Sequence, residues 1–269
     1  MQVIGLCRFS YPAIGGFQVQ HATSGERSAY LYQPARMEER FRLFEAVALP
    51  CLRHQTDPDF TMLLLVGNDL PASYLQRLGD LVSDFPQIQI LSRPPDEHRP
   101  VMKELLNEAR HDIARPCLQF RFDDDDAISV DFVERLRQVA RDCAPLLEQS
   151  GTVAIDFNRG FNARFDAGGI QASEEVVRPY FTAALGIAIR GNCKLSVMNF
   201  AHHKVHRFMP TVTFSDSPMW VRSHNGFNDS RQGAVKPVEM TPATPELEGE
   251  FSARFAIEAS KVRQVFASA

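Results

Sequence analysis

The sequence lacks the features that would assign the chain to a membrane, a secreted or a nucleic-acid-binding class. No apolar run approaches the roughly 18 residues of a membrane-spanning helix, and the short apolar stretch 3–6 has no basic leader. Acidic residues outnumber basic ones 33 to 29, and no run of five basic residues occurs, so nothing favours nucleic acid as a partner. We expect a cytoplasmic protein without a transmembrane segment, for which peripheral contact with a membrane stays open.

Cysteine is scarce and widely spaced. The chain has five cysteines and no CxxC pair, which argues against both a disulfide framework and a zinc ribbon. Cys7, Cys51 and Cys117 stand beside apolar stretches, where cysteine usually behaves as a small core residue. We therefore expect the thiols to be buried and reduced.

Apolar material, in contrast, is plentiful, with 44% hydrophobic residues and 20 phenylalanines, which indicates a globular protein. Apolar runs predict strands at residues 3–6, 60–66, 88–91, 117–122 and 152–157, and amphipathic patterns predict helices at 38–52, 71–81, 101–113 and 130–147. Strands that alternate with helices of this length are typical of βαβ units. The expected fold is α/β, with a Rossmann-like, mostly parallel sheet flanked by helices.

The part after residue 160 is less regular. We expect a strand at 181–189, a polar loop at 220–231, a connector at 237–250 and a final helix at 251–266. No internal repeat or low-complexity tract divides the chain. The prediction is one domain over residues 1–269, with a nucleotide-binding half at 1–130 and an acceptor-side half with a C-terminal tail at 131–269.

Four consecutive aspartates, residues 123–126, follow the expected strand 117–122. Adjacent carboxylates repel one another, and a divalent cation relieves the repulsion. Ligands of open α/β sheets bind outside the carboxyl ends of strands. Because alternate residues of an extended chain share a face, Asp123 and Asp125 can reach one metal. Mg²⁺ or Mn²⁺ suits such oxygens, with diphosphate and water as further ligands. The alternative is a solvated acidic turn that caps the next helix.

Several segments carry a resemblance to known enzymes. Residues 43–66 (LFEAVALPCLRHQTDPDFTMLLLV), 107–109 (NEA) and 119–129 (QFRFDDDDAIS) resemble the opening helix, the Asn-bearing helix and the DxD motif of inverting GT-A glycosyltransferases. The turn RFSYP, the DDDD run and the tract MWVRSHNGFNDSR are similar to the bacterial "putative rhamnosyltransferase" family. One departure is Gly67-Asn68-Asp69, where many relatives carry paired acidic residues, so the nucleotide base stays open.

The resemblance implies a GT-A-like fold and a metal-dependent transferase of polysaccharide biosynthesis. Such an enzyme moves a sugar, in this family rhamnose, from a nucleoside-diphosphate-sugar to a hydroxyl of a glycan or small-molecule acceptor, with inversion. Asp123 and Asp125 would then be the DxD pair on Mn²⁺ or Mg²⁺. For the donor the resemblance implies contacts from Arg8, Asp69, Arg99, Lys103, Asn107 and Asp124. The alternative for the helix residues among them is a solvent-facing surface.

Two further segments complete the expected site. Three histidines lie within residues 202–206. No HExxH pattern accompanies them, so the support for a zinc site is weak. Within the resemblance, His203 would be the general base, with Asp156 and Asp216 as rivals, and surface histidines are the plain alternative. The loop 220–231 would close over sugar and diphosphate, with His224 on the metal, Arg222 or Arg231 on phosphate and Trp220 stacked on a sugar. The alternative is a turn in which Asn and Gly are present only because they tolerate the backbone conformations of turns.

Other functions stay open at this point. A nucleotidyltransferase also places strand-end carboxylates on Mg²⁺, but Gly15-Gly16 is a poor phosphate loop. A phosphatase of the haloacid dehalogenase type would carry its acidic motif after the first strand, which argues against that class. A silent glycan- or cation-binding module is the non-enzymatic alternative. Nothing in the sequence indicates an oligomeric state.

Overall fold

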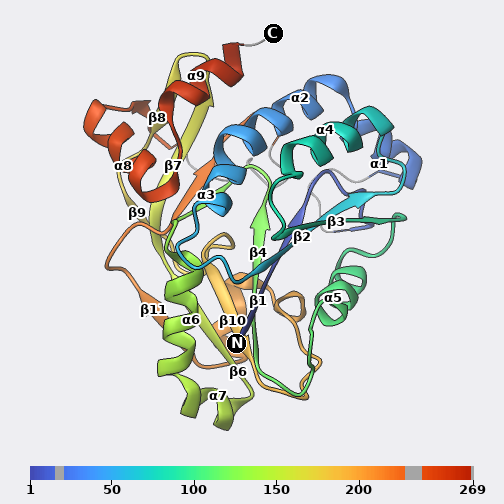
Figure 1. Ribbon diagram of the computed structural model, residues 1–269, viewed down its shortest axis with the longest axis vertical. Coiled ribbons are helices and arrows are strands. Elements are labelled where there is room, and N and C mark those ends of the chain that lie inside the picture. The colour runs from blue at the N-terminus through green and yellow to red at the C-terminus, as the bar shows by residue number, and fades with distance from the viewer. Residues whose placement is uncertain (16–20, 228–237, 268–269) are drawn as a thin grey trace.

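A computed structural model describes residues 1–15, 21–227 and 238–267, and its centre is a sheet that contains seven of the described strands (Figure 1). Its strand order is β11-β6-β10-β4-β1-β2-β3. The strands are β1 (Gln2–Arg8), β2 (Thr61–Gly67), β3 (Ile88–Arg93), β4 (Cys117–Asp123), β6 (Thr152–Phe157), β10 (Leu185–Ile189) and β11 (Thr211–Phe214). Only β10 runs antiparallel to its neighbours, β4 and β6. The expected α/β class with a mostly parallel sheet flanked by helices is confirmed.

Helices cover both faces of this sheet (Figure 1). Side chains of α2 (Pro34–Leu43), α3 (Leu49–Arg53), α4 (Ala72–Val82), α6 (Phe132–Asp142) and α7 (Ala144–Ser150) pack with one set of strand residues, including Phe120. The other face carries α5 (His98–Glu108) and the short 3-10 turns η2 (Val197–Asn199) and η3 (His202–Arg207). Because strand residues alternate between faces, Arg121, Asp123 and Asp156 lie on the side of α5 and η3.

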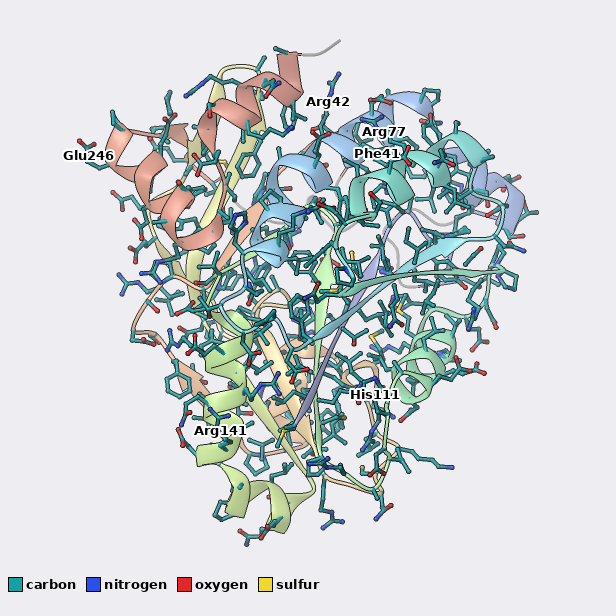
Figure 2. The ribbon with its side chains drawn as sticks, in the orientation of Figure 1. Phe41, Arg42, Arg77, His111, Arg141 and Glu246 are labelled. Carbon is teal, nitrogen blue, oxygen red and sulfur yellow. The ribbon has the colours of Figure 1, made fainter. Side chains whose placement is uncertain are left out.

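The long helix expected at 38–52 is built from three parts. A π-helical turn, Phe44–Ala48, joins α2 to α3. Helix α1 (Ser24–Leu31) precedes them and begins with a capping box between Thr23 and Glu26. Helix α4 lies beside α2, where the guanidinium carbon of Arg77 is 4.2 Å from the ring centroid of Phe41 (Figure 2). This helical layer brings α2 over the carboxyl ends of the central strands.

A second sheet occupies the C-terminal half, with the order β13-β8-β7-β12-β5 and β9 (Val176–Val177) paired to β7. Its other members are β5 (Ala127–Ile128), β7 (Arg159–Asp166), β8 (Gly169–Ala172), β12 (Trp220–Ser223) and β13 (Thr241–Pro242). Helices α8 (Pro245–Phe255) and α9 (Ala259–Ala267) cover it, and the rings of Phe161 and Phe251 lie 5.2 Å apart. The second sheet and the helices α8 and α9 therefore form an apolar layer of their own.

Several expected boundaries were wrong in this half. The loop placed at 220–231 begins as strand β12, because Trp220 and Val221 are buried between β5 and β7. The connector at 237–250 includes the start of α8, which Thr244 caps. The final helix is interrupted at Ala256, whose φ of 53° closes α8. The part of the loop at 228–231 lies outside the described residues.

The structure also bears on the expectations about cysteines and membrane-spanning helices. Cys7, Cys51 and Cys117 are buried and all five cysteines are free, as expected, although Cys143 and Cys193 are half-buried. None of the helices in the described ranges is long and apolar enough to cross a bilayer. The division into halves at residue 130 stays a prediction.

Candidate functional site

The acidic run lies where several central strands end. Arg8 at the end of β1 is the pairing partner of Asp123 at the end of β4. Asp69 follows β2, which runs parallel to β1, so it belongs to the same edge. Ligands of open α/β sheets bind at this edge, and the structure brings all three side chains to it.

Three of the four aspartates are tied to neighbouring elements. Arg40 of α2 contacts both Asp124 and Asp125, and its Nη1 lies 3.4 Å from Asp125 Oδ2. Asn225 Nδ2 donates to Asp125 Oδ2 at 2.9 Å, and the backbone N–H of Ser223 donates to Asp126 Oδ1 at 3.0 Å. These contacts fasten the acidic turn to α2 on one side and to the end of β12 on the other.

Asp123 differs from the three that follow it. Its half-buried carboxylate makes no hydrogen bond and no ion pair with any residue in the described part of the chain. Burial acts to raise the pKa of Asp123, but the positive charges of Arg8, Arg121, Arg222 and Arg40 outweigh it and hold the pKa below its usual value. The site thus presents an ionised carboxylate that no described side chain neutralises by contact.

Asp126 has the opposite character. Burial, and next the charge of Asp125, raise its pKa well above the usual value. Its Oδ2 is buried and has no hydrogen-bond partner among the described residues. A carboxyl group in this state needs either a proton or a nearby cation.

Arginines surround the carboxylates. Arg121 lies two residues before Asp123 on β4, and within the described ranges its guanidinium makes no hydrogen bond or ion pair. Burial lowers the pKa of Arg121, while the charge of Asp123 acts in the opposite direction. Arg8 and Arg99 stand close enough for their charges to act on Arg121 as well. Guanidinium groups in such a number suit an anion with several oxygens, such as a diphosphate.

The same residues can be tested against a divalent cation. Mg²⁺ is usually held by one or two carboxylates together with substrate phosphates and water, and the open carboxylate of Asp123 and the unpartnered Oδ2 of Asp126 fit that use. Asp125 would have to share its oxygens with Arg40 and Asn225. His224 Nε2 lies 3.2 Å from Asn162 Oδ1. Among the described residues no group of three or more ligating side chains is already assembled.

Some of the residues expected to contact the donor lie near the acidic run, and others do not. Asp69 Oδ1 accepts a hydrogen bond of 2.8 Å from the Tyr32 hydroxyl, and the charge of Arg99 reaches Arg121 and His98. Asn107, in contrast, donates to the carbonyls of Lys103 and Lys194 at 2.9 and 3.2 Å.

The end of α5 that carries Asn107 lies at the opposite edge of the sheet. The carbonyl of Ala109 there accepts a hydrogen bond of 2.8 Å from Gln2, at the start of β1. Lys103 lies one helical turn nearer the start of α5. The structure therefore does not bring Asn107 to the aspartates.

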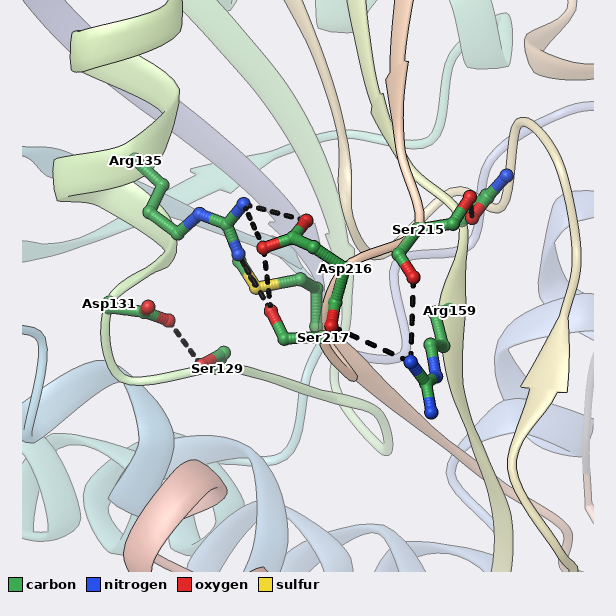
Figure 3. Close-up of polar contacts among 9 residues, drawn as sticks. Ser129, Asp131, Arg135, Arg159, Ser215, Asp216 and Ser217 are labelled. Carbon is green, nitrogen blue, oxygen red and sulfur yellow. Dashed lines mark hydrogen bonds and ion pairs between the residues drawn. The ribbon is translucent and has the colours of Figure 1, made fainter.

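The expected bases occupy different surroundings. Asp156 is fully buried, accepts the N–H of Tyr180 at 2.9 Å, and burial raises its pKa to about 6. Asp216 is exposed, and Arg135 donates to both of its oxygens at 2.9 Å (Figure 3). The slight burial of Asp216 acts to raise its pKa, but the bonds from Arg135 outweigh it and lower the pKa. His203 is exposed on η3.

The structure adds residues that the sequence interpretation did not single out. Arg40 pairs with Asp124, which is 84 residues away, and with Asp125, which follows it, and no spacing in the sequence predicts these contacts. Arg121 could have been found, because it alternates with Asp123 on the same strand. Trp220 corrects an expectation, since it is fully buried, with its ring 4.4 Å from that of Phe181, and cannot stack on a sugar. Arg231 lies outside the described residues.

Comparisons with known proteins identify a family that the sequence matches and several solved structures of low similarity. Residues 2–237 match the sequence model of the family described as "Putative rhamnosyl transferase". No curated protein matches the chain. Staphylococcus aureus TarS 1-349 is 11% identical with a TM-score of 0.41, over 83% of this chain and 60% of that one.

Two further solved structures are similar at the same level. TarS in complex with UDP-GlcNAc is 11% identical with a TM-score of 0.42, over 99% of this chain and 71% of that one. A "putative nucleotide-diphospho-sugar transferase" of Desulfovibrio desulfuricans G20 is 12% identical with a TM-score of 0.38, over 98% and 99%. The chain spans only about 60% of the length of the first TarS structure.

Proposed function

This chain belongs to the "Putative rhamnosyl transferase" family, and from that premise we propose that it is a metal-dependent glycosyltransferase. It takes a sugar, rhamnose by the family description, from a nucleoside-diphosphate donor and transfers it to a hydroxyl of a glycan or small molecule. The observation that carries the proposal is the ionised carboxylate of Asp123, which no described side chain contacts by hydrogen bond or ion pair, at the strand edge among arginines. A nucleoside diphosphate with a divalent cation has the charges that complement this arrangement.

In this proposal Asp123 would hold the cation together with the unpartnered Oδ2 of Asp126. Asp125 and His224 would be further ligands after exchanging their present contacts with Arg40, Asn225 and Asn162. A divalent cation held there would supply positive charge that stabilises the leaving diphosphate. Arg8, Arg121 and Arg222 hold the diphosphate oxygens through charge-assisted hydrogen bonds, and Arg99 and Lys103 extend this basic surface along α5. Asp69, with the Tyr32 hydroxyl at 2.8 Å, faces the nucleoside. Asp124 supports the site indirectly through Arg40.

The transfer makes one bond and breaks another. The acceptor oxygen attacks the anomeric carbon from the face opposite the diphosphate, so the configuration inverts. The bond between that carbon and the diphosphate oxygen breaks, and its electron pair leaves with the nucleoside diphosphate. The hydroxyl proton passes to a base on the acceptor side, for which His203, Asp156 and Asp216 were the candidates in the sequence.

The test is turnover of donors by the full chain. UDP-, dTDP- and GDP-linked sugars, dTDP-rhamnose among them, are incubated with Mn²⁺ and then with EDTA, and release of nucleoside diphosphate is measured. Release that depends on Mn²⁺ is the expected result. Pyrophosphate release from a nucleoside triphosphate would instead indicate a nucleotidyltransferase. Binding of nucleoside diphosphate without turnover of any donor would indicate a silent binding module.

A further inference from the structure

One imidazole of the His-rich segment is held in a defined orientation. The Nδ1 atom of His202, at the start of η3, lies 2.7 Å from the backbone carbonyl oxygen of Tyr180. A carbonyl oxygen can only accept, so Nδ1 must carry the proton. In a neutral imidazole the other nitrogen is then the acceptor. His202 therefore presents an unprotonated Nε2.

The carbonyl that orients His202 is itself fixed. Tyr180 has a φ of 60°, a conformation that non-glycine residues adopt only when their surroundings impose it. Its N–H donates to Asp156 Oδ1 at 2.9 Å, and its ring stacks on His206 with centroids 5.1 Å apart. The backbone of Tyr180 thus links the buried carboxyl of Asp156 to the ring of His202.

His202 faces a pocket beside the acidic run. The pocket has an empty volume of about 230 Å³, part of which is open to solvent, and its polar lining consists of Arg121, Thr182 and His202. Its apolar walls are Leu185, Ile187, Val197, Phe200 and Val205. Because Arg121 and Asp123 share one face of β4, the pocket adjoins the carboxylate that we assign to the cation. The guanidinium of Arg121, the hydroxyl of Thr182 and the imidazole of His202, set between apolar walls, are the kinds of group that orient a small polar ligand.

The charges that face His202 keep it in the accepting form. Burial lowers the pKa of His202, and the charges of Arg121 on β4 and of His203 on η3 lower it further. The Tyr180 carbonyl and Asp123 oppose this shift without reversing it. No hydrogen bond or ion pair joins His202 to Asp123 in the described part of the chain. Near neutral pH the ring is therefore uncharged and able to take a proton.

We propose that this pocket receives the acceptor hydroxyl and that Nε2 of His202 takes its proton during sugar transfer. The inference rests on the proposed function. As the acceptor oxygen bonds to the anomeric carbon, its proton moves to Nε2 and the ring becomes an imidazolium. The electron pair of the broken bond leaves with the nucleoside diphosphate. The imidazolium afterwards returns the proton to water.

The other candidates are less well placed for this step. Asp156 is fully buried and both of its oxygens accept hydrogen bonds, from Tyr180 and from Thr213, so it is a positioning residue that acts through the Tyr180 peptide. Arg135 occupies both oxygens of Asp216. His203, although adjacent to His202, does not line the pocket.

The test compares two histidine variants. His202→Asn keeps a side-chain donor for the Tyr180 carbonyl but removes the accepting nitrogen. His54→Asn is the matched control, because His54 Nδ1 also lies 2.9 Å from a backbone carbonyl, that of Pro50, yet His54 is exposed at the C-terminal cap of α3. We expect kcat of His202→Asn to fall at least about 100-fold. The Kd for Mn²⁺ and for whichever of UDP, dTDP and GDP the wild type binds should stay unchanged. His54→Asn should match the wild type.

The outcomes separate the two proposals. If the wild type turns over a donor and His202→Asn keeps kcat within about threefold, or if His203→Asn shows the loss instead, the assignment of the base is overturned and the transferase proposal stands. If the wild type releases nucleoside diphosphate from no donor, the proposed function itself fails.

Two further readouts report on the role of each residue. Nitrogen-15 NMR of the histidine rings should show the Nδ1–H form of His202 near neutral pH, and the Nε2–H form or an imidazolium there would overturn the inference. The acidic limb of the pH profile of kcat should vanish in His202→Asn. In Asp156→Ala it should persist with a shifted midpoint, because the Tyr180 carbonyl is no longer fixed, and an unmoved midpoint would remove Asp156 from the positioning role.

Discussion

Arg40 Nη1 lies 3.4 Å from Asp125 Oδ2 and also contacts Asp124, and all three side chains are buried. A single guanidinium from α2 therefore relieves the repulsion between two neighbours in a run of four carboxylates. The protein supplies this neutralisation itself. Asp123 and the Oδ2 atom of Asp126 are left as the parts of the run that stay open to a bound cation.

Replacement of Arg40 by Met tests the structural part of this arrangement. The substitution keeps the aliphatic stem but leaves two buried carboxylates without their cation, which should lower the free energy of unfolding by roughly 3–5 kcal/mol. Urea denaturation measures the change. Glu248→Gln is the control, because its ion pair with Arg263 is partly exposed, and its loss should cost less than about 1 kcal/mol. Equal effects of both substitutions would show that the Arg40 contacts do not matter for the fold.

Replacement of Asp123 by Asn tests the functional part. The amide has the same shape but no charge, so we expect Mn²⁺-dependent binding of whichever of UDP, dTDP and GDP the wild type binds to be lost, while circular dichroism stays that of the wild type. Titration calorimetry measures the binding. Asp80→Asn on α4 is the control, since Asp80 is exposed and its carboxylate accepts, among the described residues, a hydrogen bond only from Gln76 on its own helix. Undiminished Mn²⁺-dependent binding by Asp123→Asn would remove Asp123 from the cation site.

Asp156 should make stability depend on pH. Its pKa of about 6 in the folded protein lies above the ordinary 3.8 because the carboxyl is buried. The folded state therefore holds this proton more tightly than the unfolded state. The contribution is fully present below about pH 4 and falls by about 3 kcal/mol as the pH rises through about 6.

Asp156→Asn removes this titration and should abolish the decline. The free energy of unfolding at about pH 4 and about pH 7, compared between variant and wild type, measures the effect. The same pH slope in both proteins would contradict the assignment.

Two glycines should respond in opposite ways to alanine. A Cβ on Gly160 would lie 2.2 Å from the backbone oxygen of Trp220, which faces it across the β7–β12 pairing, and should destabilise by about 1–3 kcal/mol or more. A Cβ on Gly79 of α4 meets nothing within 4 Å, and alanine there should stabilise by about 0.5–1 kcal/mol. Thermal unfolding followed by the fluorescence of the single buried Trp220 measures both. Tolerance of Gly160→Ala would show that the second sheet can shift.

The sequence predicted those parts of the site that depend on local periodicity. The apolar runs located the central strands, and the rule that ligands lie beyond strand ends located Asp123. The contacts of Arg40 were not predictable, because nothing local to α2 depends on an aspartate 84 residues later. Which of His202 and His203 serves as the base could not be predicted for the same reason, since nothing local in the sequence decides it. It depends on the Tyr180 carbonyl, which a distant buried carboxyl holds in place.

The C-terminal half was harder to predict for a related reason. Its strands are as short as two residues, as in β5 and β13, and periodicity needs a longer window to be visible. Trp220 and Val221 looked like part of a polar loop because the residues after them are polar. Their burial follows from pairing with β5 and β7, which are distant in the chain.

The π-helical turn Phe44–Ala48 has a consequence for how chain length can vary in this family. Such a turn holds one residue more than an α-helical turn, so it absorbs an insertion without changing the direction in which the flanking helices α2 and α3 present their side chains. Deletion of one residue inside it should restore a regular helix and leave Arg40 over the aspartates. The same deletion between Arg40 and the turn would rotate Arg40 by about 100° relative to α3. Relatives whose helical segment 34–53 is one residue longer or shorter should therefore differ at this turn, because a change there leaves the site in register.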